Sequence, residues 1–222
     1  MVTAHGHIEA ASFRIPAGRA WVDGDLSIPA DPKGLVVFAS GSGATRNNPR
    51  DQKLAAYMNE EGYAALLLDL LTSHEESVAA STDGLSHDIP TLAQRLIDTS
   101  EWLTWNRDTS TLKVGYFGTG IGAAAALIAA AGLPSLVQAV VCLEGRPDLA
   151  GPSLPELKAP TLLIAASRDE SVLQFNRSAL EAMTCERSME IIPGAGHRFE
   201  ETGALDEVAR LSRAWFDRHL AG

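Results

Sequence analysis

The strongest constraint on the fold of this 222-residue chain is an alternation between short apolar runs and longer segments with helical spacing. The apolar runs cover residues 35–39, 64–68, 114–117, 137–143 and 161–165, with a shorter run at 189–192. Consecutive apolar residues are typical of strands buried on both faces of a parallel sheet. Helical spacing predicts helices near residues 49–61, 88–105, 120–131, 171–183 and 203–219. The pattern predicts an α/β fold with a doubly wound, mostly parallel sheet of seven or eight strands.

Two further features bear on the architecture. Alternating runs at residues 8–13 and 19–28 flank Pro16-Ala17-Gly18, which predicts an antiparallel hairpin at one edge of the sheet. The segment that follows residue 143 is short and contains Pro147, Pro152 and Pro155, so it has little room for a helical lid. No linker-like stretch divides the chain, and we expect one domain over residues 1–222.

Composition narrows the possible partners. The 18 Lys and Arg residues against 28 Asp and Glu give a formal net charge of −10, which disfavours nucleic acid. No apolar run approaches the roughly 18–20 residues of a membrane helix, and the first residues do not resemble a secretory signal. Neither Cys142 nor Cys185 lies in a metal-binding pattern. We expect a cytoplasmic monomer or homodimer that binds a small-molecule substrate, without metal or cofactor.

Candidate chemistry lies where strands end, because ligands of doubly wound sheets bind at the carboxyl ends of the strands. The first strand-end loop is Ser40-Gly41-Ser42-Gly43, whose backbone amides can approach a substrate closely. The second is Gly118-Thr119-Gly120-Ile121-Gly122, which has the small-residue spacing of a nucleophile elbow with Gly120 at its centre. A tight packing turn or a phosphate-binding glycine loop remains an alternative, although the spacing does not fit a dinucleotide fingerprint.

Two later loops supply an acid and a base. Asp169 follows the run at 161–165, and His197 follows the run at 189–192 through Pro193-Gly194-Ala195-Gly196. The chain order of elbow, acid and histidine is that of α/β-hydrolases.

With these loops the sequence resembles the α/β-hydrolase superfamily, and within it the lid-free dienelactone-hydrolase branch. Segments 66–72, 145–150 and 199–201 are also similar to that group, and the resemblance covers about residues 34–220. It implies a Ser or Cys nucleophile, an Asp–His pair and an oxyanion hole of two backbone amides. Asp169 matches the acid and His197 the base, but Gly120 stands at the nucleophile position and has no side chain to form an acyl-enzyme.

The other site residues follow from this placement. The resemblance assigns the oxyanion hole to the N–H of Ile121 together with that of Gly41 or Ser42. We expect four further polar residues to bind substrate near the opening of the site at the strand ends: Ser40, Arg46, Glu144 and Arg146. Arg46 and Arg146 could grip a substrate carboxylate, and Glu144 could be a second acid or base. An ion pair between Glu144 and an arginine is the favoured alternative.

Three functions remain open. The first is an enzyme that uses the His197–Asp169 dyad without a side-chain nucleophile, acting on a small ester, lactone or carbonyl compound through activated water or proton transfer. The second is a serine hydrolase whose nucleophile has been replaced by Gly120. The third is a non-catalytic binding protein on the same fold. The retained acid and base favour the first two, because a binding protein has no need of that pair.

Overall fold

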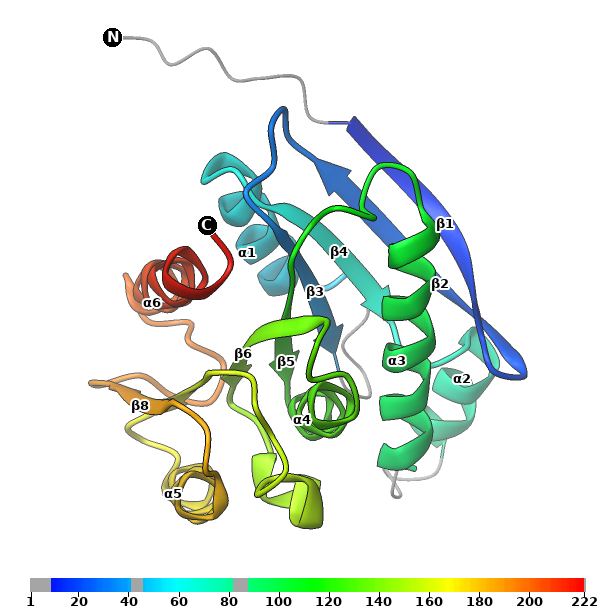
Figure 1. The fold of residues 1–222 in the computed structure, drawn as a ribbon. Coiled ribbons are helices and arrows are strands. Elements are labelled where there is room, and N and C mark those ends of the chain that lie inside the picture. The colour runs from blue at the N-terminus through cyan, green and yellow to red at the C-terminus, as the bar shows by residue number, and fades with distance from the viewer. Residues whose placement is uncertain (1–8, 41–45, 82–87, 222) are drawn as a thin grey trace, which may run out of the picture.

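The structure is a computed structural model, and it describes residues 9–40, 46–81 and 88–221. Within those residues eight strands form one sheet in the order β1-β2-β4-β3-β5-β6-β7-β8 (Figure 1). The strands are β1 (Glu9–Ala17), β2 (Ala20–Ile28), β3 (Leu35–Ser40), β4 (Ala64–Asp69), β5 (Val114–Thr119), β6 (Val137–Leu143), β7 (Thr161–Ala166) and β8 (Arg187–Ile192). All neighbours from β4 to β8 pair in parallel. The predicted doubly wound α/β fold is confirmed.

The helices lie on both faces of the sheet. They are α1 (Pro49–Glu60), α2 (Ser73–Ser81), α3 (Ile89–Trp105), α4 (Ile121–Gly132), α5 (Glu170–Ala182) and α6 (Ala204–His219), with the 3₁₀-helix η1 (Pro147–Ser153). Figure 1 shows α3 and α4 on one side of the central strands and α1 on the other. The predicted helices agree with the observed ones to within one residue or two at each end.

The two apolar cores explain why the strand sequences are apolar on consecutive residues. In β3, Val37 belongs to the core that also contains residues of α3 and α4. Its neighbours Val36 and Phe38 belong to the opposite core, which contains residues of α1 and α6. Successive side chains of a strand point to opposite faces, so a strand covered on both sides must be apolar throughout.

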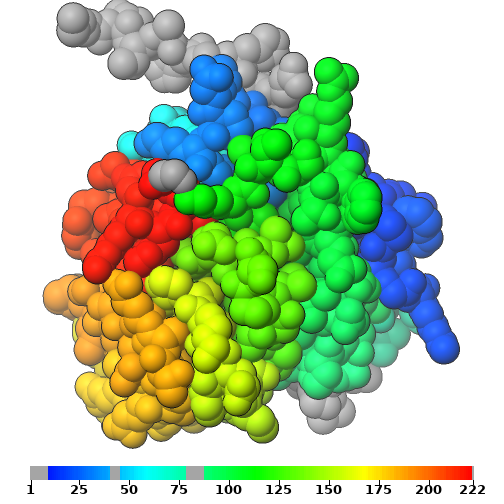
Figure 2. All heavy atoms as spheres, viewed as in Figure 1, coloured from blue at the N-terminus to red at the C-terminus, as the bar shows by residue number. Residues whose placement is uncertain are grey.

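The edges of the sheet also follow the prediction. β1 and β2 pair antiparallel, and β2 continues antiparallel onto β4, so the hairpin forms one edge. In the space-filling view of Figure 2 the hairpin lies on one flank of the molecule and the segment of α5 and β8 on the opposite flank. Between β6 and β7 the chain forms only η1, so the predicted absence of a helical lid at this connection is confirmed.

Helix α2 was not predicted, because its sequence lacks an apolar stripe. Its anchor is an ion pair, in which the Arg95 guanidinium donates to both carboxylate oxygens of Glu75 at 2.7 Å. Arg95 also donates to the carbonyl of Leu70, and its side chain is only 9% exposed. The hydrogen bonds from Arg95 lower the pKa of Glu75 to about 2. The α2 helix thus depends on a long-range charge contact that local periodicity does not show.

The order of strands places a switch point between β3 and β5. The chain runs from β3 to β4 on one side and from β5 to β6 on the other, and Ser40 pairs with Thr119 at the carboxyl ends. Such switch points leave a crevice outside the strand ends where ligands bind. The two small-residue loops picked out from the sequence both begin here.

No helix among the described residues is long and apolar enough to cross a membrane.

The turn from β5 into α4 is packed too closely for a side chain at Gly118. A Cβ atom there would lie 2.6 Å from Cα of Ala123, and backbone cannot yield as a flexible side chain can. We predict that Gly118→Ala lowers the free energy of unfolding by about 1–3 kcal/mol in urea denaturation. Gly132→Ala is the control, since its Cβ would make only ordinary contact with Ile97 at 3.4 Å. Equal stability of the two variants would contradict this account of the turn.

Candidate active site

The loops after β7 and β8 are joined by backbone hydrogen bonds. The N–H of Ser167 donates to the carbonyl of Ile192 at 3.2 Å, and the N–H of Arg168 donates to that of Ala195 at 3.1 Å. Gly194 N–H donates to the Ser167 hydroxyl at 2.8 Å. These bonds continue the strand pairing beyond the sheet and hold the two loops side by side.

Asp169 has two roles at the end of this loop. Its Oδ1 accepts a hydrogen bond of 3.1 Å from Val172 N–H, which makes it the N-cap of α5. Its Oδ2 lies 2.8 Å from Nδ1 of His197. Because the cap fixes Oδ1, the carboxylate is held in an orientation that turns Oδ2 towards the imidazole. The acid and the histidine predicted from the sequence are thus brought together.

The loop of His197 has its own support. Gly196 N–H donates to Oε1 of Glu201 at 3.0 Å, and this bond holds the pKa of the Glu201 carboxyl below its ordinary value. The His197 side chain is 62% exposed, so its far side can be reached from solvent. Sequence reasoning did not assign Glu201 a role, although the segment 199–201 contributed to the family resemblance.

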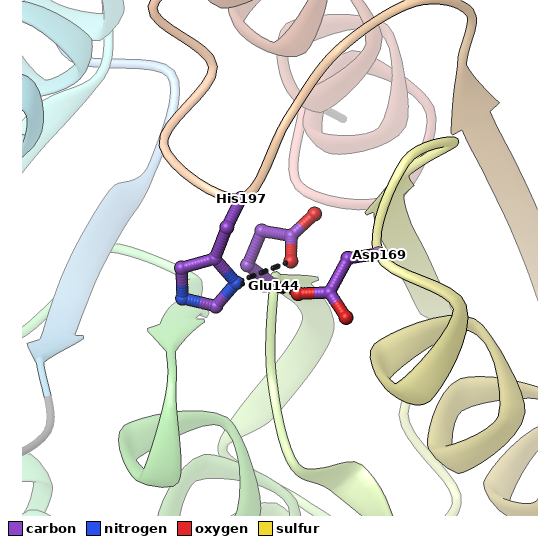
Figure 3. Close-up of side chains that lie close together, drawn as sticks. All are labelled: Glu144, Asp169 and His197. Carbon is purple, nitrogen blue, oxygen red and sulfur yellow. Dashed lines mark hydrogen bonds and ion pairs between the residues drawn. The ribbon is translucent and has the colours of Figure 1, made fainter.

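Glu144 is the third member of the cluster in Figure 3, where its side chain points to the same ring nitrogen as that of Asp169. Its Oε2 lies 3.1 Å from His197 Nδ1, and its side chain is 2% exposed. Its Oε1 accepts a short hydrogen bond from Ala166 N–H at the end of β7. The favoured sequence alternative, an ion pair between Glu144 and an arginine, was wrong, because Arg46 and Arg146 contact other carboxylates.

The surroundings of Glu144 change its chemistry. Burial raises the pKa of Glu144 to about 7, while the Ala166 N–H and His197 act in the opposite direction. The backbone of Glu144 has φ of +47°, an uncommon conformation for a residue with a side chain. A buried carboxyl held in this backbone is a candidate functional group rather than a surface charge.

The turn at Gly120 has the shape expected of an elbow. Its φ of +57° and ψ of −127° differ from those of both β5 and α4, which it connects. The Gly120 carbonyl accepts the N–H groups of Ala123 at 3.3 Å and Arg146 at 3.0 Å. The second bond ties the elbow to the segment that follows β6 and carries Glu144.

A side chain at Gly120 would have space. A Cβ atom there would meet no heavy atom within 4 Å among the described residues. Helix α4 begins at Ile121 and has no side-chain cap, and the first N–H groups of a helix lack partners inside it. The predicted oxyanion donor Ile121 is therefore at a helix N-terminus next to the elbow, where negative charge is favoured. The other predicted donors, Gly41 and Ser42, lie outside the described residues.

Three further residues predicted at the mouth have internal partners. The Ser40 hydroxyl is buried and donates to Asp51 in α1. The Arg46 guanidinium donates to Asp25 at 2.7 Å and to Asp69 at 3.1 Å.

Arg146 donates two hydrogen bonds to Asp148 and lies over the ring of Phe175 at 4.0 Å. The bidentate bonds to Asp148 further raise the high pKa of Arg146. Both arginines predicted to grip a substrate carboxylate are thus occupied by carboxylates of the chain.

A cavity of about 800 Å³ opens beside His197. Its described lining residues are Asn48, Pro49, Arg50, His197, Arg198, Phe199, Glu200 and Leu205. Arg50, in the first turn of α1, was not picked out from the sequence, where it stands among polar residues with no motif. Its Nε is buried and has no hydrogen-bond partner among the described residues.

The arrangement can move a proton. Nδ1 of His197 faces carboxylates, so the proton of the neutral ring is held on Nδ1 and the lone pair is left on Nε2. Nε2 of an imidazole held in this way can take a proton from water or from a substrate.

The chain is similar to known proteins over most of its length. The sequence pattern of the Dienelactone hydrolase family matches residues 22–218. A crystal structure of a dienelactone hydrolase from Anabaena variabilis shares 46% identity, covers 96% of this chain and 99% of that one, and superposes with a TM-score of 0.92. Est1E from Butyrivibrio proteoclasticus is 13% identical, the match covers 93% of this chain and 98% of that one with a TM-score of 0.76, and it shows the fold alone.

A Mycobacterium tuberculosis protein named "Putative phosphoribosyl transferase" is 46% identical over 209 residues. The match covers 94% of this chain and 46% of that protein, so the chain spans about half the length of this curated relative.

The double role of Asp169 can be tested by stability. We predict that Asp169→Ala lowers the free energy of unfolding by about 0.5–2 kcal/mol, because Val172 N–H loses its cap. Asp169→Asn keeps an oxygen that can accept the same bond and should stay closer to the parent chain. Urea denaturation of both variants at pH 7 measures the difference. Equal losses in the two variants would show that the cap contributes nothing.

Proposed function

Since this chain belongs to the dienelactone hydrolase family, we propose that it is a hydrolase-like enzyme that works without a side-chain nucleophile. His197 is its general base, Asp169 orients the base, and backbone N–H groups bind the developing oxyanion. The substrate is a small ester, lactone or other carbonyl compound. We place the enzyme in the cytoplasm and assign it no cofactor.

One observation carries the proposal, the hydrogen bond of 2.8 Å between His197 Nδ1 and Asp169 Oδ2. A carboxylate at this position fixes the ring tautomer and stabilises the imidazolium that forms when the base accepts a proton. Asp169 is itself fixed by capping α5, and the His197 side chain is 62% exposed. A protein that only binds a ligand gains nothing from such a pair.

The hydrolytic step balances with water as the nucleophile. Nε2 of His197 removes a proton from water as the oxygen adds to the substrate carbonyl carbon, and the carbonyl oxygen becomes an oxyanion. When the carbon–oxygen bond to the leaving alkoxide breaks, the imidazolium returns the proton to that alkoxide. The products are a carboxylic acid and an alcohol, and the base is regenerated. The same base could instead remove a C–H proton in an elimination, isomerisation or cyclisation.

Ile121 N–H supports the charged intermediate. It lies at the start of α4 beside Gly120, where the helix dipole also favours negative charge. One oxyanion-hole donor is typically worth roughly 3–4 kcal/mol of transition-state stabilisation. A second N–H from Gly41 or Ser42 would complete the hole.

A second function is favoured by the backbone at Gly120, a serine hydrolase whose nucleophile has been replaced by glycine. The positive φ and the open space beside Cα are those of a turn that displays a side chain above the sheet. An acyl-enzyme would then have formed at residue 120 in the parental enzyme, and ester or lactone hydrolysis would be its activity.

The name of the mycobacterial relative does not extend to this chain. More than half of that protein lies outside the match, and its name describes the whole. The dienelactone hydrolase family covers the portion that is shared, so carbonyl chemistry is the more direct inference.

The role of His197 is tested by its removal. We predict that His197→Ala lowers kcat by about 10²–10⁴-fold on any substrate that the parent chain turns over, because the base is lost. A panel of small activated esters and lactones, assayed in the presence of a chelator, identifies that substrate. Unchanged turnover in the variant would remove His197 from the mechanism.

The role of Gly120 is tested by restoring an oxygen. We predict that Gly120→Ser gains hydrolysis of small activated esters and is labelled by an organophosphonate at residue 120, because Oγ would stand near the base. The parent chain should remain unlabelled. Intact-mass and peptide-mass spectrometry locate the label.

Gly120→Ala is the matched control for strain. Both variants put a Cβ at a positive φ, which costs about 1–3 kcal/mol of stability, but only serine adds a nucleophile. If the serine variant folds yet shows neither labelling nor turnover, the base and oxyanion hole are not disposed as in a hydrolase. If Gly120→Ser gains esterase activity but loses an activity of the parent chain, the result supports an enzyme that works without a nucleophile. It then counts against a serine hydrolase whose serine has been replaced.

A further inference from the structure

We propose that Glu144, Asp169 and His197 form a binding site for a divalent metal ion. This inference goes beyond the proposed function, in which Glu144 has no role, and it differs from the expectation from sequence that the chain holds no metal. It stands on the positions of three donor atoms and on the buried Glu144 oxygen, which makes no hydrogen bond among the described residues.

The spacing of the donors fits one ion. Nδ1 of His197 lies 2.8 Å from Asp169 Oδ2 and 3.1 Å from Glu144 Oε2, and the three residues offer ligand atoms within 4.8 Å of one another. Two ligands that each lie about 2.1 Å from one ion are about 3.0 Å apart at an octahedral angle and about 3.4 Å apart at a tetrahedral one. The two separations from Nδ1 are close to these spacings, so the three side chains are near enough to share one ion.

The buried oxygen of Glu144 supplies an independent observation. Glu144 Oε2 is enclosed, on a side chain only 2% exposed, and makes no hydrogen bond among the described residues. It points at Nδ1, but that nitrogen carries at most one proton, which Asp169 already accepts. A buried carboxylate oxygen that receives no hydrogen bond is destabilising, and a cation would satisfy it.

Both carboxylates are oriented by their second oxygens. Glu144 Oε1 accepts from Ala166 N–H, and Asp169 Oδ1 accepts from Val172 N–H. Each carboxylate therefore keeps one oxygen fixed by backbone and turns the other towards His197. Metal ligands are commonly held in this way by hydrogen bonds behind them.

The donor set indicates the class of ion. One imidazole nitrogen with two carboxylate oxygens suits Zn²⁺, Co²⁺ or Mn²⁺ rather than a thiophilic ion. When both carboxyl groups are ionised, the site has two negative charges beside one imidazole. A dication balances that charge, and water would fill its remaining coordination positions.

Metal and base chemistry exclude each other at this imidazole. When the ion binds Nδ1, the proton of the neutral ring must lie on Nε2, and Nε2 loses the lone pair that would accept a proton. An occupied site should therefore inhibit the base-catalysed reaction proposed above. This consequence rests on the proposed function, whereas metal binding itself does not.

The test uses the full chain after treatment with a chelator and buffer exchange. Co²⁺ is titrated in and followed by its visible absorption, and Zn²⁺ is titrated in an isothermal calorimeter. We expect one ion per chain with a dissociation constant below about 100 μM. We expect Glu144→Gln to weaken binding at least about tenfold, because it removes one anionic ligand while keeping the size of the side chain.

Two controls separate this site from others. Glu170→Gln removes a neighbouring charge whose carboxylate contacts Gln174 and Arg177 instead, and it should bind as the parent does. A His5→Ala, His7→Ala double variant removes the terminal histidines, and it should also bind as the parent does. Asp169→Asn serves as a second ligand variant if Glu144→Gln does not fold in a thermal melt.

The outcomes decide the proposal. Binding that is lost in Glu144→Gln and Asp169→Asn but kept in both controls supports it. No binding below 100 μM, or binding that disappears only with His5 and His7, overturns it. The metal titrations need no substrate, so their result is independent of the proposed function. The activity assay of His197→Ala in the presence of a chelator tests the proposed function without metal.

Discussion

The site depends on the parallel pairing of neighbouring strands from β3 through β5, β6 and β7 to β8. Its hydrogen bonds align the carboxyl ends of five strands at one edge, and the following residues have to leave the sheet there. Gly120, Glu144, Asp169 and His197 are separated by up to 77 positions in the chain, yet each follows one of these strands directly or within a short loop. The apolar faces that bury the sheet thus also determine where polar groups can meet.

Much of this arrangement could be predicted from the sequence. The strands and helices follow from residue patterns, and Asp169 and His197 follow from their place after β7 and β8. What the sequence could not show was which partner each charged side chain takes. Arg46 and Arg146 contact nearby aspartates, and Glu144 contacts His197, because the partner depends on loop geometry rather than on position along the chain. Helix α2 was missed for the same reason, since a distant arginine stabilises it.

The candidate site combines a contact between an acid and a histidine with a strand–helix turn that has glycine at its centre. The turn at Gly120 leads directly into α4, and Asp169 Oδ2 lies 2.8 Å from His197 Nδ1, whereas residue 120 has no side chain. The His197 imidazole faces two carboxylates, one of them buried. Under the two proposals above, chemistry at this site begins from a proton, a water molecule or an ion rather than from a covalent bond to the chain.

The backbone of Glu144 adds a thermodynamic consequence. A glutamate at φ of +47° costs of the order of 1–3 kcal/mol relative to a residue that adopts this conformation freely. Glycine would relieve that strain and remove a buried carboxyl from the interior, although loss of the hydrogen bond from Ala166 N–H would offset part of the gain. At this position the backbone conformation therefore favours glycine, whereas the contact with His197 requires the carboxylate. A version of the chain optimised for resistance to heat alone would tend to discard the carboxylate, and it would gain robustness while its histidine kept only one acidic neighbour.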